Sequence, residues 1–248
     1  MTLPTRNRLS FGATALDQML GGGLLEGSAT LVSGAPGVGK TTLGLQFLMA
    51  GVQARQTGLL VSFEEFPTSL IRDALQLGWD LKQLEKEGKI GIIFTSPDVL
   101  LESLKIGELG PIAQKIQTVD PSRVVFDSMA HFQRLTSNAL ELREIFNTLV
   151  NATKRQGMTS LLLDEAVKPL QTRQGQLASL PFLVDTVLLL RYVEVDSSIE
   201  RAIAVMKMRG SAHQKEIRRF VIKRGGLEIG DPFTGREGIL TGTTYRIS

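Results

Sequence analysis

The chain of 248 residues contains no cysteine, which excludes disulfide bonds and metal sites built from thiolates. It has no apolar run near the roughly 20 residues of a membrane-spanning helix, and residues 1–6 lack the apolar core of a signal peptide. Lys and Arg number 28 against 25 Asp and Glu, and the surplus of +3 is too small to predict a nucleic-acid partner from charge. We therefore expect a cytoplasmic protein that makes no contact with a membrane.

Short apolar runs alternate with helical patterns along most of the chain. The runs that suit buried strands are 30–33, 59–63, 91–94, 124–126, 160–163 and 186–190, and the helical patterns are 42–54, 68–77, 100–118 and 139–156. This alternation indicates an α/β protein with a mainly parallel sheet flanked by helices. Residues 201–209 alternate in type, and 216–229 suit two strands around a Gly-Gly turn, which predicts an antiparallel C-terminal extension. No linker or repeat interrupts the chain, so we expect a single domain over 1–248.

The most informative motif is GAPGVGKT at 34–41, a full match to GxxxxGK[ST] between a strand pattern and a helix pattern. Its glycines allow backbone N–H groups to converge on an anion, and they are Gly34, Gly37 and Gly39. Lys40 can reach the terminal phosphates, and Thr41 offers a hydroxyl to Mg²⁺. An ordinary glycine-rich turn is the alternative, but Lys and Thr in register favour a site for a nucleoside triphosphate.

Acidic residues end two of the apolar runs. Asp127 follows the run 124–126 and can hold a metal, often through water, although capping of the next turn is the alternative. Glu64 and Glu65 end the run 59–63, where two carboxylates can poise a water for attack on phosphate. From the spacing alone, this catalytic role and a purely electrostatic one, in which acidic residues stabilise the start of a helix, are equally supported.

Two cations lie two residues apart on the strand pattern near the end of the chain. Lys207 and Arg209 should therefore point to the same face of that strand. They could be solvated residues of an edge strand, or a pair of cations that reaches a phosphate. The sequence leaves open whether that phosphate belongs to their own subunit or to a neighbour. The two histidines, His131 and His213, have no partner at metal-ligand spacing, so we expect no zinc site.

Several stretches of the chain resemble the KaiC family of RecA-like P-loop ATPases. They are 16–24, 31–41, 46–48, 62–65, 78–81, 126–128, 206–213 and 238–242. The block 207–213, Lys-Met-Arg-Gly-Ser-Ala-His, is far more specific than the phosphate loop, which many families share. The resemblance implies a RecA-like P-loop NTPase fold, ATP and Mg²⁺ as ligands, and a homohexameric ring with ATP between subunits.

The resemblance also implies roles residue by residue. The positions that would hold phosphates and metal are Gly37, Val38, Gly39, Lys40, Thr41 and Thr42. Glu64 and Glu65 match the family's catalytic carboxylates, and Asp127 matches its metal-side acid. The positions that would reach ATP on the adjacent subunit are Lys207, Met208, Arg209, Ser211 and His213. Among these, the two strong cations would neutralise phosphate charge in trans as the bond breaks.

The chain departs from the family's clock proteins in three respects. Those proteins carry two such domains in tandem, whereas this chain carries one. Leu77 replaces an aromatic residue that contacts the base, and Lys223-Arg224 lie near the strand that contacts the nucleotide. Pro181 and Phe182 occupy the positions of adjacent Ser and Thr phosphoryl acceptors and carry no hydroxyl, so autokinase activity is not expected, although Ser179 lies nearby.

The leading functional hypothesis is an ATP-hydrolysing ring whose turnover times or switches the binding of an unidentified regulatory protein. The alternative is a RecA- or RadA-like recombination mediator or motor that grips DNA. Its channel segments would be 128–138 and 166–181, where the few cations and the lone aromatic Phe132 predict weak DNA binding at most. A third possibility, an ATP sensor that hardly hydrolyses, is disfavoured by Glu64 and Glu65.

Overall fold

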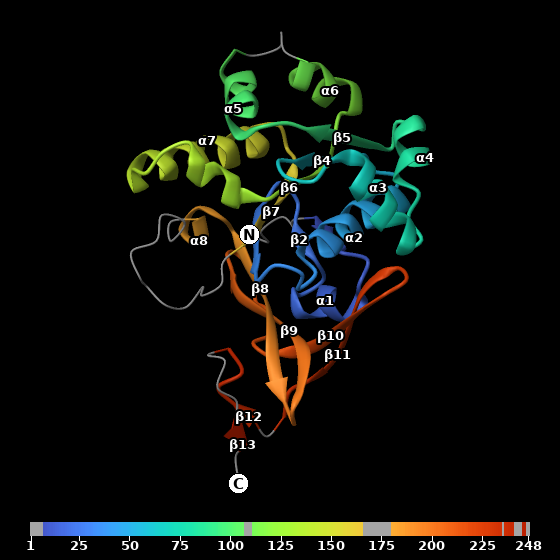
Figure 1. Cartoon of the computed structure of the whole chain (residues 1–248), viewed down its shortest axis with the longest axis vertical. Coiled ribbons are helices and arrows are strands. Elements are labelled where there is room, and N and C mark those ends of the chain that lie inside the picture. Colours follow the sequence, from blue (N-terminus) through green and yellow to red (C-terminus); the bar gives the residue numbers. More distant parts are fainter. Residues whose placement is uncertain (1–6, 107–110, 166–179, 235, 241–244, 247–248) are drawn as a thin grey trace, which may run out of the picture.

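In the computed structural model, which describes residues 7–106, 111–165, 180–234, 236–240 and 245–246, the chain forms a nine-stranded mixed sheet with helices on both faces (Figure 1). The order across the sheet is β11-β10-β9-β8-β3-β7-β6-β4-β5. The parallel strands are β3 (Ala29–Gly34), β4 (Gly58–Ser62), β5 (Ile90–Phe94), β6 (Arg123–Asp127), β7 (Thr159–Asp164) and β8 (Thr186–Val195). The antiparallel extension contains β9 (Ser198–Met208), β10 (Arg218–Lys223) and β11 (Gly226–Pro232), which confirms the predicted fold class.

Two apolar clusters cover the two faces of this sheet. Successive strand residues point to opposite faces, so Val32 belongs to one cluster and Leu31 to the other. The first face packs against α1 (Thr14–Met19), α2 (Lys40–Gln53), α3 (Pro67–Gln76) and α4 (Leu81–Lys86). The second packs against α5 (Pro97–Ile106), α6 (Pro111–Val119), the 3₁₀ helix η1 (Met129–Arg134), α7 (Ala139–Arg155) and α8 (Leu180–Leu183). Two short strand pairs join β1 (Arg8–Leu9) to β2 (Leu24–Leu25) and β12 (Arg236–Glu237) to β13 (Tyr245–Arg246).

Some predicted element boundaries are wrong. The pattern over 100–118 forms two helices instead of one, since α5 ends at Ile106 and α6 begins at Pro111. Proline suits the first turn of a helix but lacks the N–H that a continuing helix needs. The sequence patterns also miss α4, although its start carries a capping signal: the Asp80 carboxylate accepts a hydrogen bond from the backbone N–H of Gln83 at 2.9 Å.

The antiparallel part of the sheet begins earlier than predicted, because β8 continues to Val195. Asp196 and Ser197 adopt φ of 48° and 63° and return the chain directly into β9. A two-residue turn in this left-handed region matches the twist of a hairpin. Figure 1 shows the resulting long hairpin extending away from the helices. Its register brings Met208 back beside Thr186, at the beginning of β8.

A fully buried arginine ties three segments together beneath α2. Arg123 is 1% exposed, and its guanidinium donates hydrogen bonds to Gln56 Oε1 at 2.9 Å, Ser10 O at 2.7 Å and Phe47 O at 2.8 Å. Burial lowers the pKa of Arg123 to about 10. Gly51 of α2 makes room for this side chain, because a Cβ there would lie 2.7 Å from Arg123 Cδ.

Replacing this arginine should destabilise the fold measurably. We expect Arg123→Ala to lower the free energy of unfolding by about 3 kcal/mol, because it opens a cavity and leaves buried acceptors unpaired. Urea unfolding measures the change. Gly51→Ala should destabilise the wild-type protein but be tolerated in the Arg123→Ala background, where the clash has gone and alanine favours the helix. Equal effects of Gly51→Ala in both backgrounds would contradict this packing.

Candidate functional site

The phosphate-loop motif connects the end of β3 to the start of α2. Gly37 and Gly39 have φ of 73° and 118°, a region that other residues rarely adopt. Gly34 packs against the neighbouring strand, since a Cβ there would lie 2.6 Å from Leu190 O. The Val38 side chain is fully buried, so this residue can offer only its backbone to a ligand. The loop therefore presents backbone groups at the amino end of a 14-residue helix, where an anion is favoured.

The two polar residues of the motif are held in place by short contacts. Lys40 is 6% exposed, and its ammonium donates hydrogen bonds to Gly34 O and Ala35 O at 3.0 Å each. The Thr41 hydroxyl, in the first turn of α2, donates a hydrogen bond to Asp127 Oδ2 at 2.7 Å. Asp127 ends β6, which is separated from β3 by one strand, β7. A cation, a hydroxyl and a carboxylate thus lie together beside the loop, as the sequence predicts.

These groups line a cavity of ≈ 220 Å³ at the carboxyl ends of the parallel strands. Its lining residues are Gly37, Gly39, Lys40, Thr41, Thr42, Ser62, Glu64, Glu65, Asp127, Glu165 and Ile222. Sequence reasoning misses Glu165 and Ile222. Glu165 comes directly after β7, just as Asp127 is the last residue of β6. The rule that acidic residues at the ends of parallel strands converge could therefore have identified Glu165 as well. Ile222 comes from β10 and reaches the loop only through the antiparallel extension.

Burial strongly perturbs the acids around this cavity. Desolvation raises the pKa of Asp127 to about 6, although the hydrogen bond from Thr41 opposes the shift. Desolvation likewise raises the pKa of Asp164, at the end of β7, to about 6 against the opposing charge of Lys40. The pKa of Glu65 is raised by burial and by the nearby charges of Asp73 and Glu64. A bound cation would therefore stabilise the charged forms of these carboxylates.

The residues at the loop fit Mg²⁺ in chemistry. Thr41 and Asp127 supply a hydroxyl and a carboxylate, the hard oxygen ligands that Mg²⁺ prefers. Within the described part of the chain, no group of three acidic or histidine side chains forms a complete cation site. Mg²⁺ beside nucleotides is typically held by one or two protein oxygens together with phosphates and water, which this pair matches.

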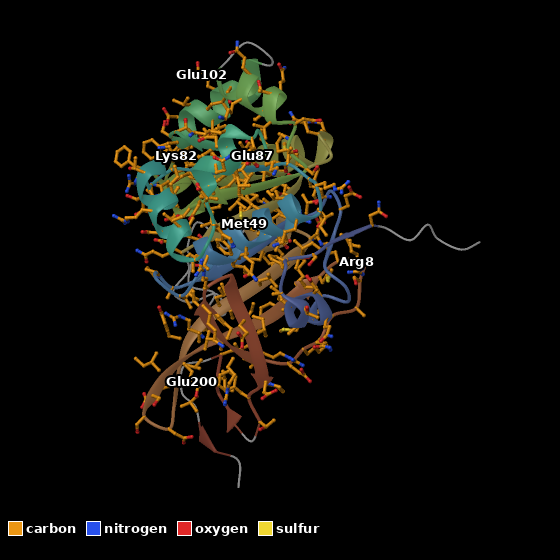
Figure 2. The ribbon with its side chains drawn as sticks, turned by 90° about the vertical axis from the view of Figure 1, so that its right-hand side faces the viewer. Arg8, Met49, Lys82, Glu87, Glu102 and Glu200 are labelled. Carbon is orange, nitrogen blue, oxygen red and sulfur yellow. The ribbon has the colours of Figure 1, made fainter. Side chains whose placement is uncertain are left out.

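The raised pKa of Asp164 predicts a pH-dependent stability. Because the folded-state pKa of about 6 exceeds the ordinary 3.8, this group favours folding at low pH, and the benefit is lost as pH rises through 6. In nucleotide-free protein, Asp164→Asn should therefore raise the free energy of unfolding by about 2 kcal/mol at pH 8 and hardly change it near pH 4. Urea unfolding across this range is the measurement. The exposed Glu102, labelled in Figure 2, provides the control Glu102→Gln. An Asp164→Asn effect that is independent of pH would contradict the assignment.

The paired glutamates follow the end of β4 and line the same cavity. Their turn is fixed by Ser62, whose hydroxyl donates to Glu65 O at 2.8 Å and accepts from Glu65 N at 3.2 Å. Glu64 Oε2 lies 3.1 Å from His131 Nε2 of η1. The sequence assigns His131 no role beyond the expectation that it binds no zinc, but the structure places its ring against a candidate catalytic carboxylate.

The two C-terminal cations do not line this cavity. Lys207 Nζ donates hydrogen bonds to Pro181 O and Val184 O at 2.7 Å each, and Arg209 Nη2 donates to Phe182 O at 2.8 Å. Both side chains therefore bind backbone carbonyls at α8. Burial and the nearby charge of Arg209 lower the pKa of Lys207.

Strand register explains this separation. Thr186 is level with Thr30 at the start of β3, and Met208 is level with Thr186, so the cations lie at the amino edge of the parallel strands. The phosphate loop begins after Gly34, at the carboxyl edge, and the strand between the two edges is about 13 Å long. Lys207 and Arg209 thus lie at the opposite ends of the parallel strands from the phosphate loop of their own chain.

The other residues of the family block have varied surroundings. The Met208 side chain is 8% exposed and belongs to the first core cluster, so it could offer a nucleotide only its backbone. Ser211 Oγ accepts a hydrogen bond from Arg8, and His213 is partly exposed. The two halves of the predicted site therefore do not come together within one chain.

The first segment predicted for a DNA channel, 128–138, gives little support to DNA binding. Phe132, the one aromatic residue considered for base stacking, is fully buried and packs against Phe63 and Phe146 with ring centroids 5.2 Å and 5.7 Å away. In the second segment, 166–181, the residues 166–179 lie outside the described part of the chain, and Ser179, the nearby candidate phosphoryl acceptor, is one of them.

None of the described helices is long and apolar enough to cross a membrane.

Comparisons with known proteins give a family model and several relatives that match most of this chain. A family model described as the KaiC ATPase matches residues 9–233. The circadian clock protein KaiC3 of Synechocystis sp. is 38% identical over 237 residues, which cover 95% of this chain and 46% of that protein. The circadian clock oscillator protein KaiC of Thermosynechococcus vestitus is 37% identical over 243 residues, which cover 97% of this chain and 46% of that protein. The chain thus spans about half the length of the curated relatives it matches.

Proposed function

This chain belongs to the KaiC family of ATPases, and from that premise we propose that it assembles into a homohexameric ring and hydrolyses Mg-ATP at the seams between its subunits. In this proposal, residues 1–248 form one ATPase domain with two functional surfaces. One surface carries the phosphate loop and the acidic residues around its cavity. The other carries Lys207 and Arg209, which would act on the nucleotide held by the neighbour.

The observation that carries the proposal is the register of β3, β8 and β9. It places the phosphate loop at one edge of the parallel strands and the pair Lys207 and Arg209 at the other. A phosphate held by the loop is therefore out of reach of these cations in the same subunit. In a ring of identical subunits joined head to tail, each seam brings two different surfaces together, which supports a shared site.

Each residue of the loop side has a proposed task. The backbone of the loop and Lys40 would bind the phosphates, while Thr41 and Asp127 would hold Mg²⁺, which supplies neutralising charge at the phosphate oxygens. Glu64 and Glu65 would orient a water, and one of them would accept its proton as its oxygen attacks the terminal phosphorus and the bond from that phosphorus to the leaving ADP breaks. His131 would fix the direction of the Glu64 carboxylate through their 3.1 Å contact.

On the neighbouring side, Lys207 and Arg209 would stabilise the negative charge that develops on the transferred phosphoryl group. To do so they must exchange the carbonyls of Pro181, Phe182 and Val184 for phosphate oxygens. Pro181 and Phe182 offer no hydroxyl as acceptor, so we propose hydrolysis without autophosphorylation. We further propose that turnover switches the binding of a regulatory protein in the cytoplasm.

Size measurement with and without Mg-ATP, run beside a phosphate-release assay, tests this function. We expect an ATP-dependent hexamer that releases phosphate and whose intact mass is unchanged after long incubation with Mg-ATP. Hydrolysis by a monomer would contradict the shared seam, and a silent ring would indicate a nucleotide sensor. Stoichiometric phosphate on the protein would make it an autokinase.

DNA binding is the second candidate function, and a salt titration decides between the two. We expect at most weak, sequence-independent binding that disappears as ionic strength rises, because phosphate contacts weaken with salt. The buried position of Phe132 leaves this segment without a stacking platform. Tight binding of single strands at physiological salt would favour a recombination mediator instead.

A further inference from the structure

An arginine near the start of the described chain joins two segments that are far apart in sequence. Arg8, in β1, donates hydrogen bonds through Nη1 to Leu20 O and Gly23 O at 2.8 Å each. Its Nη2 donates to Ser211 Oγ at 2.5 Å, across 203 positions of sequence. Figure 2 labels Arg8 beside the dark blue ribbon of α1.

The loop that receives Arg8 has a backbone suited to this contact. Gly21, Gly22 and Gly23 have φ of 67°, 110° and 113°, a region that side chains disfavour. A Cβ on Gly22 would lie 3.3 Å from Arg8 Cδ, and one on Gly21 would lie 3.1 Å from Ala212 O. The glycine loop, 20–23, is therefore packed between Arg8 and the segment that follows β9.

That segment, 210–214, continues directly from Lys207 and Arg209. Ser211 and the residues after it form no helix or strand, so their position depends on contacts with other parts of the fold. Those contacts are the Arg8 bond and a backbone hydrogen bond from Gln214 N to Met19 O at 2.9 Å. Both connect the segment to α1 and the glycine loop.

We propose that Arg8 is a positioning residue for catalysis in the neighbouring subunit. It holds the segment 210–214, and with it the end of β9, in the orientation from which Lys207 and Arg209 reach the neighbour's phosphates. This inference rests on the proposed shared seam. The planar guanidinium suits the task, because Nη1 serves the two carbonyls and Nη2 serves the hydroxyl, and this fixed fork of two donor nitrogens has no equivalent in the single nitrogen of an ammonium.

Arg8 does not line the cavity at its own phosphate loop. Its removal should therefore impair the surface that a subunit presents to its neighbour and leave the subunit's own ATP binding intact. This separation distinguishes positioning from a general effect on the fold.

The test uses Arg8→Met, which keeps an apolar stem and removes the donors. Rings of this variant should bind ATP normally and hydrolyse it at least about 10-fold more slowly, since misplaced cations lose transition-state contacts. Arg8→Lys should recover part of the rate, and Arg143→Met, at an exposed arginine of α7, should not change it. Wild-type hydrolysis by Arg8→Met rings would overturn the proposal.

Mixed rings give the sharper readout. Lys40→Ala subunits lack a working phosphate loop but retain intact Arg8, Lys207 and Arg209. When they are mixed at random with Arg8→Met subunits, about a quarter of the seams combine two intact surfaces, and hydrolysis should recover accordingly. Arg209→Ala mixed with Lys40→Ala is the positive control, because it removes a cation of the seam directly.

The outcomes separate this inference from the function on which it rests. Recovery with Arg209→Ala but not with Arg8→Met would retain the seam and overturn the role of Arg8. No recovery with either variant in confirmed mixed rings would overturn the seam and this inference together. If Arg8→Met fails to fold, Arg8→Gln removes the guanidinium but keeps a shorter polar side chain; it should lower the rate about 3-fold with the same recovery in mixed rings, and an unchanged rate would overturn the proposal.

Discussion

Protein carrying both Glu64→Gln and Glu65→Gln is expected to bind ATP with unchanged affinity and to hydrolyse it at least about 100-fold more slowly. The two glutamates follow β4 and line the cavity beside the phosphate loop. Glutamine keeps their size and their place in the turn but cannot accept a proton from the attacking water. Because that proton moves only in the transition state, binding of the ground state should persist.

Phosphate release measures the rate, and calorimetry measures ATP affinity. Glu102→Gln, at an exposed position of α5, is the control for removing a carboxylate and should not change either quantity. Affinity that falls in step with the rate would assign the pair to metal binding or to folding. Because burial raises the pKa of Glu65 above 4.5, wild-type hydrolysis should also fall as pH is lowered through that raised pKa, where the base becomes protonated.

Lys40→Ala is expected to weaken ATP binding at least about 100-fold, because the loop loses a charge-assisted contact to the terminal phosphates. The Lys40 ammonium is almost completely buried and is held at the loop by Gly34 O and Ala35 O, so no neighbouring side chain replaces it easily. Its charge also opposes the protonation of Asp127 and Asp164. Removing it should raise the pKa of both acids further.

Calorimetric titration with Mg-ATP tests this result, and urea unfolding confirms that the variant is folded. Thr42→Ala, two positions further along in the first turn of α2, is a control that keeps the cation; we expect a much smaller loss of affinity. Unchanged binding by folded Lys40→Ala would remove the loop from its proposed role.

The parts of the site that depend on local chain geometry are predictable from sequence. The loop at 34–41 is a continuous motif whose glycines and following helix are set by neighbouring residues, and the structure places it at the end of β3 as expected. Asp127 and Glu64 also follow from a simple rule: parallel strands end at the same edge of a sheet, so acids at their tips converge. The predicted sheet and its antiparallel extension are confirmed for the same reason, since strand periodicity is local.

Contacts between distant segments follow no such rule. The approach of His131 to Glu64 depends on how η1 folds after β6, and Ile222 reaches the cavity only because β10 belongs to the antiparallel extension.

The sequence by itself therefore determined which chemical groups this protein carries: a phosphate-loop motif, acids at the ends of parallel strands, and a pair of cations near the end of the chain. Only the tertiary structure decided how these groups are divided in space. A two-residue hairpin turn and the register of β8 and β9 return Lys207 and Arg209 to the amino edge of the sheet, away from their own loop. The contact between Arg8 and Ser211 arises in the same way, because pairing of strands and packing of loops, unlike a motif, join residues without regard to their distance along the chain.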